Sequence, residues 1–215
     1  MTGASLGDPG RPSIDGEIDG AVGDDVGRDV PGQHQFGPGV ERFDEAVDAA
    51  MERMRGNPTV DRIFTTASHV GDFSLIWHAT NAVLGLVNRR PKRVLAFAAL
   101  IGLESLVVNQ GVKRLFKRSR PTTTGDTGLQ VRRPRTSSFP SGHASAATFA
   151  AAMLAPRVGW PSSALIRAAA AVVATSRAYV RIHHASDVVA GVLTGGVLVS
   201  VTRRVVHRFG WNEFM

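Results

Sequence analysis

The apolar residues of the chain gather into five segments, which short polar or basic stretches separate. Each segment is long enough for a helix, but none is an uninterrupted run of about 20 apolar residues, the length that spans the hydrocarbon core of a bilayer. The pattern predicts an all-α chain whose helices are slightly short for a membrane. The segments cover residues 73–87, 94–112, 144–155, 164–180 and 188–202.

A further helix is predicted ahead of these segments, at residues 41–55. One of its faces is charged and the other is apolar at helical spacing, so we expect it to lie on a surface without crossing a bilayer. The turn residues Gly56-Asn57-Pro58 end it. We assign residues 41–66 to this amphipathic surface region. Its apolar positions are Phe43, Val47, Ala50, Met51 and Met54.

Two interpretations of the five segments compete: transmembrane helices, or the buried core of a soluble helical bundle. Gly191 and Gly195 allow helices to approach closely where lipid replaces water. Basic clusters at 89–93 and 203–208 stand where apolar stretches end, as they do at the borders of a membrane. We therefore predict a membrane helical bundle of about five or six helices, preceded by an acidic disordered tail.

The formal net charge of +7 hides two parts of opposite sign. Residues 1–60 contain 12 acidic and 5 basic side chains, whereas the remaining 155 residues contain 6 acidic and 20 basic ones. Residues 1–40 are also rich in Gly, Pro and Asp and poor in large apolar residues, so we predict that they form a disordered tail. The excess of basic side chains in the remaining 155 residues indicates a negatively charged partner. Because no DNA-binding motif is visible, we expect no nucleic acid and favour an anionic lipid surface or a phosphorylated substrate.

The chain contains no cysteine, which excludes a disulfide framework and a thiolate metal site. Its N-terminus does not show a basic region followed by an apolar run, so we expect no cleavable secretory signal. If the protein enters a membrane, its internal helices direct it there.

Basic residues that could hold a phosphate occur in two places. Lys113 and Arg120 are seven positions apart, so two helical turns would put them on one face before Pro121 ends the helix. Arg177 follows Ser176 near the end of an apolar segment. Phosphate hydrolysis needs fixed cations aimed at the oxygens of the transition state, and these three side chains are the candidates.

A helix start is predicted at Pro140-Ser141-Gly142-His143, just before the alanine-rich segment. Ser141 is a candidate N-cap, and the free backbone N–H groups at a helix start bind anions. Gly142 would let the backbone approach a phosphate closely, which places His143 beside the bound group.

His183 and Asp187 are four positions apart, or one helical turn. A carboxylate bonded to one ring nitrogen of a histidine fixes the tautomer and leaves the lone pair of the other nitrogen free for attack. The pair is therefore a candidate nucleophile with its orienting group.

Together these motifs resemble the three-part signature of the type 2 phosphatidic acid phosphatase superfamily, which also includes bacterial acid phosphatases and vanadium haloperoxidases. The resemblance covers roughly residues 68–207, and we assign residues 67–210 to a phosphatase domain of this kind. It implies that His183 attacks the phosphate to form a phosphohistidine, that Asp187 orients it, and that His143 protonates the leaving oxygen. The phosphate-binding residues that it implies are Lys113, Arg120, Ser141, Gly142 and Arg177.

Other polar residues beside the motifs receive no role. We expect Arg114, Lys117 and Arg118 to form a solvated basic run, and His184 to point away from His183. Three cations aimed at one spot oppose a divalent ion, so we predict hydrolysis without a metal or other cofactor.

These features predict a multi-pass phosphatase of the cell membrane that acts on a lipid phosphate or on a polyprenyl phosphate or diphosphate. The alternatives are a soluble acid phosphatase, a vanadate-dependent haloperoxidase and a non-catalytic membrane protein that binds anionic lipid. Counting segments puts the loops 88–93 and 156–163 on one face with the C-terminus, and the motifs on the other. The basic caps place the first face in the cytoplasm, so we expect the site on the extracytoplasmic side.

Overall fold

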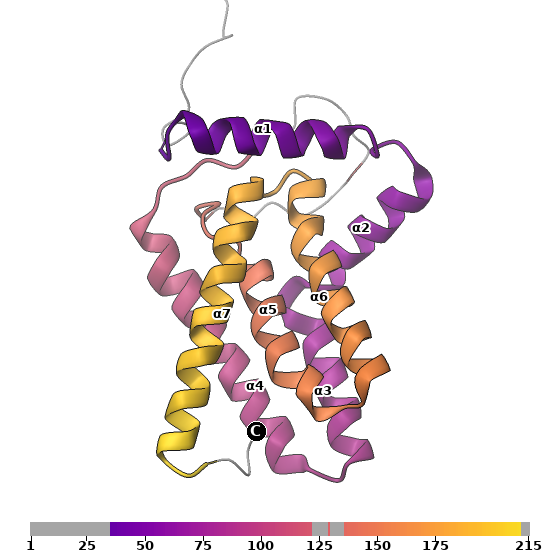
Figure 1. Cartoon of the computed structure of the whole chain (residues 1–215), viewed down its shortest axis with the longest axis vertical. Coiled ribbons are helices and arrows are strands. Elements are labelled where there is room, and N and C mark those ends of the chain that lie inside the picture. The colour runs from indigo at the N-terminus through magenta and orange to yellow at the C-terminus, as the bar shows by residue number, and fades with distance from the viewer. Residues whose placement is uncertain (1–34, 122–128, 130–135, 212–215) are drawn as a thin grey trace, which may run out of the picture.

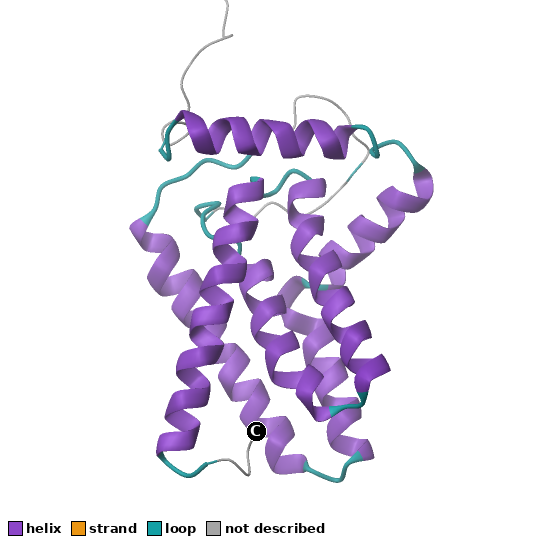
Figure 2. Ribbon diagram, in the orientation of Figure 1, coloured by secondary structure: helices purple, strands orange, loops and turns teal. Residues whose placement is uncertain are grey.

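The computed structural model describes residues 35–121, 129 and 136–211, and all regular secondary structure in these residues is helical (Figure 2). The predicted all-α class is confirmed, although seven α-helices are described where five or six were expected. The α-helices are α1 (Pro38–Glu52), α2 (Pro58–Val70), α3 (Leu75–Val87), α4 (Pro91–Leu106), α5 (Gly142–Leu154), α6 (Trp160–Tyr179) and α7 (Ala185–Arg208). The shorter turns are η1 (Asp72–Ser74), η2 (Val107–Gly111), η3 (Val112–Leu115) and η4 (Ala155–Arg157).

The helix that the sequence analysis missed is α2. Its N-cap is Asn57, whose side chain accepts hydrogen bonds from the backbone N–H groups of Thr59 at 3.0 Å and Val60 at 3.3 Å. Pro58 occupies the first helical position, where its missing N–H costs nothing. The residues that we expected only to end a helix therefore also start the next one.

α1 lies across the end of the bundle, over the ends of α6 and α7 (Figure 1). It begins at Pro38. Of the tail predicted for residues 1–40, the part up to residue 34 lies outside the described residues. Asp44 of α1 is buried and contacts Arg118 and Ser186, so this helix is anchored to the bundle by a polar contact.

α5 forms the centre of the bundle, where it packs against α4, α6 and α7. Nine of its 13 residues are buried, and most of these are alanine. Gly191 and Gly195 of α7 face it so closely that a side-chain carbon would collide with the carbonyl oxygen of Ser141 or Ser145, respectively. The close helix approach predicted for these two glycines is confirmed.

Large apolar side chains are exposed along the outer faces of the bundle. Leu86 on α3, Leu95 on α4 and Leu193 on α7 are 79, 72 and 65 % exposed. The stretches Pro91–Leu115 and Ala185–Arg208 are long and apolar enough to cross a membrane, and only 22 and 28 % of their most apolar windows are buried inside the protein. A core helix of a soluble protein would be mostly buried. This exposed apolar belt indicates a membrane protein and opposes the soluble alternatives.

The expectation that Lys113 and Arg120 share one face of a helix was wrong. After α4 the chain passes through the π turn η2 and the 3₁₀ turn η3, and it becomes extended at Phe116 (φ −126°, ψ 144°). Residues 116–121 are not helical. Five basic residues lie between positions 113 and 120, and like charges three or four positions apart destabilise a helix.

The two ends of the bundle carry different features, as counting segments predicts. The turn between α3 and α4, the turn η4 and the C-terminal end of α7 lie at the end away from α1 (Figure 1). The start of α5 and the junction of α6 and α7 point toward α1. The motifs therefore gather at the α1 end.

Candidate active site

The three motifs meet beneath α1, near the turn that joins α6 to α7. Arg120 Nη1 lies 3.2 Å from His183 Nε2, which joins the first motif to the third across 63 positions of sequence. The backbone N–H of Ser141 donates to the carbonyl oxygen of Asp187 at 2.9 Å, which joins the second motif to the third. Residues from three separate stretches thus form one region.

His183 lies in the turn between α6 and α7 and is 3 % exposed. Its backbone N–H donates to the carbonyl oxygen of Arg177 at 3.0 Å, which fixes the turn. A guanidinium has only donors, so the contact with Arg120 places the lone pair on His183 Nε2 and the proton on Nδ1. Nδ1 faces Asp187 Oδ2 at 3.5 Å, a long contact of the kind that tightens when a substrate binds.

The environment of His183 keeps its ring neutral. Burial lowers the pKa of His183 to about 3; the carboxylate of Asp187 opposes the shift, and the charges of Arg120 and Lys113 add to it. At physiological pH the imidazole is therefore uncharged. A neutral ring with its lone pair on Nε2 is suited to nucleophilic attack.

Asp187 is fully buried in the first turn of α7, where the helix N-terminus favours a negative charge. Its Oδ2 accepts a hydrogen bond from the backbone N–H of His184 at 2.9 Å. His184, to which the sequence analysis gives no role, is the N-cap of this helix, and its Nε2 lies 3.3 Å from the carbonyl oxygen of Ser119. The carboxylate is thus held in place before it meets His183.

Arg118 corrects the sequence prediction, because it is buried and not solvated. It is 4 % exposed, and its guanidinium donates to Asp187 Oδ1 and to Asp44 Oδ2, both at 2.6 Å. The ring of Phe36 covers it, with the centroid 5.0 Å from the guanidinium carbon. Its spacing from Arg120 is a signal that could have found it, since residues two apart in an extended chain point to the same side.

Asp72 is a site residue that the sequence analysis missed. Its Oδ1 lies 2.9 Å from His143 Nε2 and 3.9 Å from Arg177 Nη1. The turn η1 holds it there, with Phe73 and Ser74 in the left-handed region (φ 52° and 58°). Such conformations are costly for residues other than glycine and gather at functional sites. No local pattern points to Asp72, which is 71 positions from His143.

The contact with His143 also sets the charge of Asp72. The hydrogen bond from His143 lowers the pKa of Asp72 below its ordinary value, against the opposing effect of burial. The carboxylate is therefore ionised and accepts the proton on His143 Nε2. Nδ1 of His143 is left as the nitrogen available to a substrate.

Two of the three cations of the site are buried. Lys113 and Arg177 are 7 and 2 % exposed, and Lys113 is close enough to Arg120, Arg177 and Asp187 for electrostatic interaction. Arg177 Nη1 donates to the hydroxyl of Ser68, whereas its Nε is buried with no hydrogen-bond partner among the described residues. A buried guanidinium N–H without an acceptor is unfavourable, so this part of the site is suited to an anion.

The start of α5 adds backbone donors to these cations. Ser141 is the N-cap, and its hydroxyl accepts from the backbone N–H of Ala144 at 3.4 Å. The first N–H groups of a helix have no partner within the helix and favour an anion. A side-chain carbon at Gly142 would lie 3.2 Å from Asn109 Oδ1 and 3.8 Å from Lys113 Nζ, so the glycine leaves space beside the lysine.

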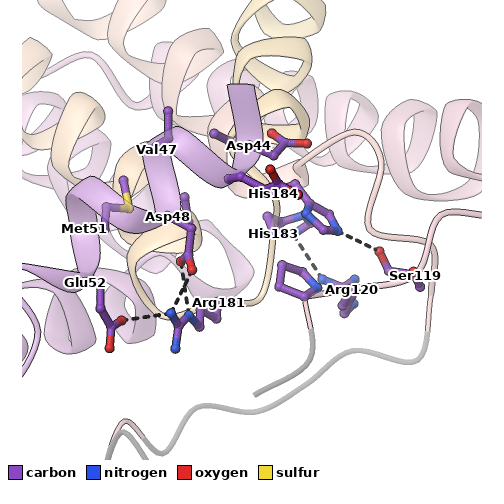
Figure 3. A pocket seen from close by; sticks show the side chains of 14 residues that line it. Asp44, Val47, Asp48, Met51, Glu52, Ser119, Arg120, Arg181, His183 and His184 are labelled. Atoms are coloured by element: carbon purple, nitrogen blue, oxygen red, sulfur yellow. Dashed lines mark hydrogen bonds and ion pairs between the residues drawn. The ribbon is translucent and has the colours of Figure 1, made fainter. Parts of the chain in front are cut away.

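A cavity of about 500 Å³ lies between α1 and the loops that carry the motifs (Figure 3). Arg120 and His183 line it on one side, and acidic side chains of α1 line it on the other. Two of these, Asp48 and Glu52, are paired with Arg181 at 2.7 and 2.8 Å. The other predicted site residues do not line this cavity, so it reaches the site from the side of His183.

Within residues 35–121, 129 and 136–211, no three His, Asp or Glu side chains are grouped as they would be around a metal ion. Hydrolysis without a metal stays a prediction from the sequence.

Comparison with protein families matches residues 93–211 to the PAP2 superfamily. The decaprenylphosphoryl-5-phosphoribose phosphatase of Mycolicibacterium smegmatis is 33 % identical over 154 residues, which cover 70 % of this chain and 82 % of that protein. The protein of the same name from Mycobacterium tuberculosis (strain ATCC 25618 / H37Rv) is 29 % identical over 140 residues, or 64 and 76 % of the two chains.

Among solved structures, the chain is similar to a transmembrane PAP2 type phosphatidylglycerolphosphate phosphatase from Bacillus subtilis. The TM-score is 0.63 at 22 % sequence identity, over 80 % of this chain and 89 % of that one. The likeness shows a shared fold. The helix α1 and the turn η1, which carry Asp44 and Asp72, both precede the residues that match the family.

Proposed function

This chain belongs to the PAP2 superfamily, and from that premise we propose that it hydrolyses a lipid phosphate or polyprenyl phosphate through a phosphohistidine on His183. The observation that carries the proposal is the environment of His183. Its Nε2 is buried 3.2 Å from Arg120, its ring is neutral, and its Nδ1 faces a fixed carboxylate. A nucleophilic nitrogen, a cation that can bind the phosphate and a carboxylate that orients the ring therefore lie close together.

In the first step the phosphate lies among Lys113, Arg120 and Arg177, at the N-terminus of α5. Nε2 of His183 attacks the phosphorus atom, and the bond from phosphorus to the alcohol oxygen breaks. Burial lowers the pKa of His143, and the hydrogen bond to Asp72 opposes this shift, as does the charge of a bound phosphate. In its doubly protonated form His143 gives its Nδ1 proton to that oxygen, so the alcohol leaves neutral. Asp187 stabilises the positive charge that develops on the phosphorylated ring.

In the second step a water molecule attacks the phosphohistidine. His143, which has lost its proton, takes one from the water, and the bond from phosphorus to Nε2 breaks. Inorganic phosphate leaves, and both histidines return to their starting states. The cations serve both steps, because each transition state spreads negative charge over the equatorial oxygens.

We propose a polyprenyl-linked phosphate monoester as the leading substrate. Two curated relatives, at 33 and 29 % identity, are phosphatases of a decaprenyl-linked phosphoribose. The apolar belt supports the same choice, because a lipid tail can stay in the bilayer while its phosphate reaches the end of the bundle. The 500 Å³ cavity offers polar walls to a head group.

We further propose a multi-pass topology with the site on the extracytoplasmic side. The turn between α3 and α4 contains Arg89, Arg90, Lys92 and Arg93, and it lies at the end away from the site. Short loops rich in lysine and arginine remain in the cytoplasm.

Phosphate release by detergent-solubilised protein, with a chelator present, tests the proposal. The panel contains a polyprenyl-linked phosphoribose phosphate, phosphatidylglycerol phosphate, phosphatidic acid and a water-soluble monoester. Wild type should release phosphate most rapidly from the first, and His183→Ala should release none. His207→Ala is the matched control, because His207 is exposed on α7 and should be dispensable. Equal release by His183→Ala, or release by wild type only after a metal is added, would contradict the mechanism.

A further inference from the structure

A second polar cavity lies at the opposite end of the bundle from the site. It has a volume of about 180 Å³ and lies between the turn that joins α3 to α4 and the turn η4. Arg90, Arg93 and Arg157 contribute to its lining, together with Asn81 and Asn88. Among the described residues that line it there is no Asp or Glu. The cavity therefore collects positive charge at a place that the hydrolytic mechanism does not use.

Arg157 is the residue that most needs a partner here. Its Nη1 donates to Asn81 Oδ1 at 3.4 Å, and its guanidinium lies over the ring of Phe97, 5.9 Å from the centroid. Its Nε and Nη2 are buried, and neither has a hydrogen-bond partner within the described part of the chain. Buried guanidinium donors without acceptors are costly, so the site is complete only with an acceptor in the cavity.

The charges around the cavity favour an acceptor that is an anion. Burial lowers the pKa of Arg157, and the positive charge of Arg93 adds to the effect. Arginine nevertheless stays protonated in proteins, so both side chains keep their positive charge. Arg90 is the N-cap of the 16-residue helix α4, and the dipole at this end of the helix also favours negative charge. A phosphate group has the charge and the several oxygens that such a cluster binds.

We propose that this cavity binds the phosphate group of an anionic phospholipid in the membrane leaflet at the end of the bundle away from the active site. The helices that flank the cavity favour a lipid over a free anion. Leu86 and Val87 at the end of α3 and Leu95 near the start of α4 are 79, 74 and 72 % exposed, and they offer apolar surface to acyl chains beside the cavity. Basic pockets between transmembrane helices bind anionic head groups in this way.

Titration of the solubilised protein with phosphatidylglycerol tests the proposal, with the thermal unfolding midpoint as the readout. Phosphatidylcholine and inorganic phosphate are the parallel titrants. Phosphatidylglycerol should raise the midpoint of wild type, and phosphatidylcholine should not. Arg157→Gln should weaken the apparent affinity for phosphatidylglycerol about tenfold, as expected for one charge-assisted contact.

Arg204→Gln is the matched control, because it removes an exposed arginine at the same end of the bundle and should leave the affinity unchanged. Hydrolysis of a water-soluble phosphate ester by Arg157→Gln should match that of wild type, which shows that this variant is folded. If it does not fold, Arg93→Gln takes its place in the same titration.

Three results would overturn the proposal. The first is an equal response of Arg157→Gln and wild type to phosphatidylglycerol. The second is an equal response of wild type to phosphatidylcholine. The third is a full response of wild type to inorganic phosphate that depends on Arg157, which would make the ligand a free anion and not a lipid.

Discussion

At the scale of single residues, each histidine of the site is paired with one carboxylate. Asp187 faces the ring that is proposed to attack the phosphate, and Asp72 bonds the ring that is proposed to protonate the leaving oxygen. Asp187 is itself held by Arg118, which Asp44 of α1 binds from the other side. The two rings therefore depend on residues far from the motifs in sequence.

Arg118→Lys tests the importance of this bridge. Lysine keeps the positive charge but has no planar fork, so it cannot bond Asp44 and Asp187 together as the guanidinium does. We expect kcat to fall about tenfold with little change in KM, because the substrate does not contact this residue. The control is Arg114→Lys, the same exchange at an exposed position, which should be neutral. Equal kinetics for the two variants would show that the bridge does not position Asp187.

Asp72→Asn tests the support of His143. The pKa of Asp72 is lowered in the folded protein, so the stabilising contact of its ionised carboxylate is fully present above the ordinary pKa of an aspartate. This contact is lost only as the pH falls through the lowered pKa. Between about pH 5 and pH 9 the wild type therefore keeps the charge that favours a protonated His143. In the variant we expect kcat to fall about tenfold or more and the alkaline limb of the pH profile to move to lower pH.

Substrates with different leaving groups distinguish a role of Asp72 in proton transfer from a purely structural role. An aryl phosphate with a good leaving group needs less protonation, so Asp72→Asn should lose less activity with it than with a lipid phosphate. An unmoved alkaline limb, or the same loss with both substrates, would remove Asp72 from the acid–base step.

At the scale of elements, the packing of α5 against α7 carries the site, because Ser141 and Asp187 are bonded through the backbone at this contact. Gly191 permits the approach. A side-chain carbon there would collide with the Ser141 carbonyl and lie 2.9 Å from Ala144 Cβ. The site thus depends on a helix contact that tolerates no added atom.

Gly191→Ala should therefore destabilise the protein by about 1–3 kcal/mol, the usual cost of overpacking, and should reduce activity. Gly196→Ala is the control on the same helix, because an added carbon there meets nothing within 4 Å. Alanine has the better helix propensity, so this control should be neutral or slightly stabilising. Thermal unfolding in detergent compares the two variants. Equal midpoints would show that the helices can separate at no cost.

The sequence was sufficient to place five of the seven described α-helices from their apolar segments and α1 from its amphipathic pattern. Its three motifs named residues that the fold brings together. Prediction from the sequence failed where two local signals for secondary structure compete. Asn57 carries both an end signal and a start signal, so α2 was missed. The crowded cations before Arg120 prevent the helix that their spacing suggested. Asp72 acts through a contact 71 positions away, which no local pattern records. Arg118 was overlooked although its spacing from Arg120 suits an extended chain with both side chains on one side.

At the scale of the whole molecule, charge and apolar surface are distributed along one axis. The motifs lie at the end that α1 covers, exposed apolar side chains surround the bundle, and basic turns mark the other end. This order is the basis for the proposed orientation in the membrane.

Because the chain has no cysteine, single introduced thiols can report this orientation. Ala49 is exposed on α1 and Ser162 is exposed at the start of α6, at opposite ends of the bundle. In intact cells an impermeant maleimide should label Ala49→Cys, whereas Ser162→Cys should react only after permeabilisation. The reverse pattern would place the site in the cytoplasm.

His183 is proposed to carry the phosphoryl group during turnover. The most direct test is rapid quenching in base with a substrate labelled in its phosphate, because phosphohistidine survives base but not acid. We expect a base-stable, acid-labile label on the wild type that His183→Ala lacks. Label that persists in His183→Ala, or turnover by wild type at full rate with no labelled protein at any time, would contradict it.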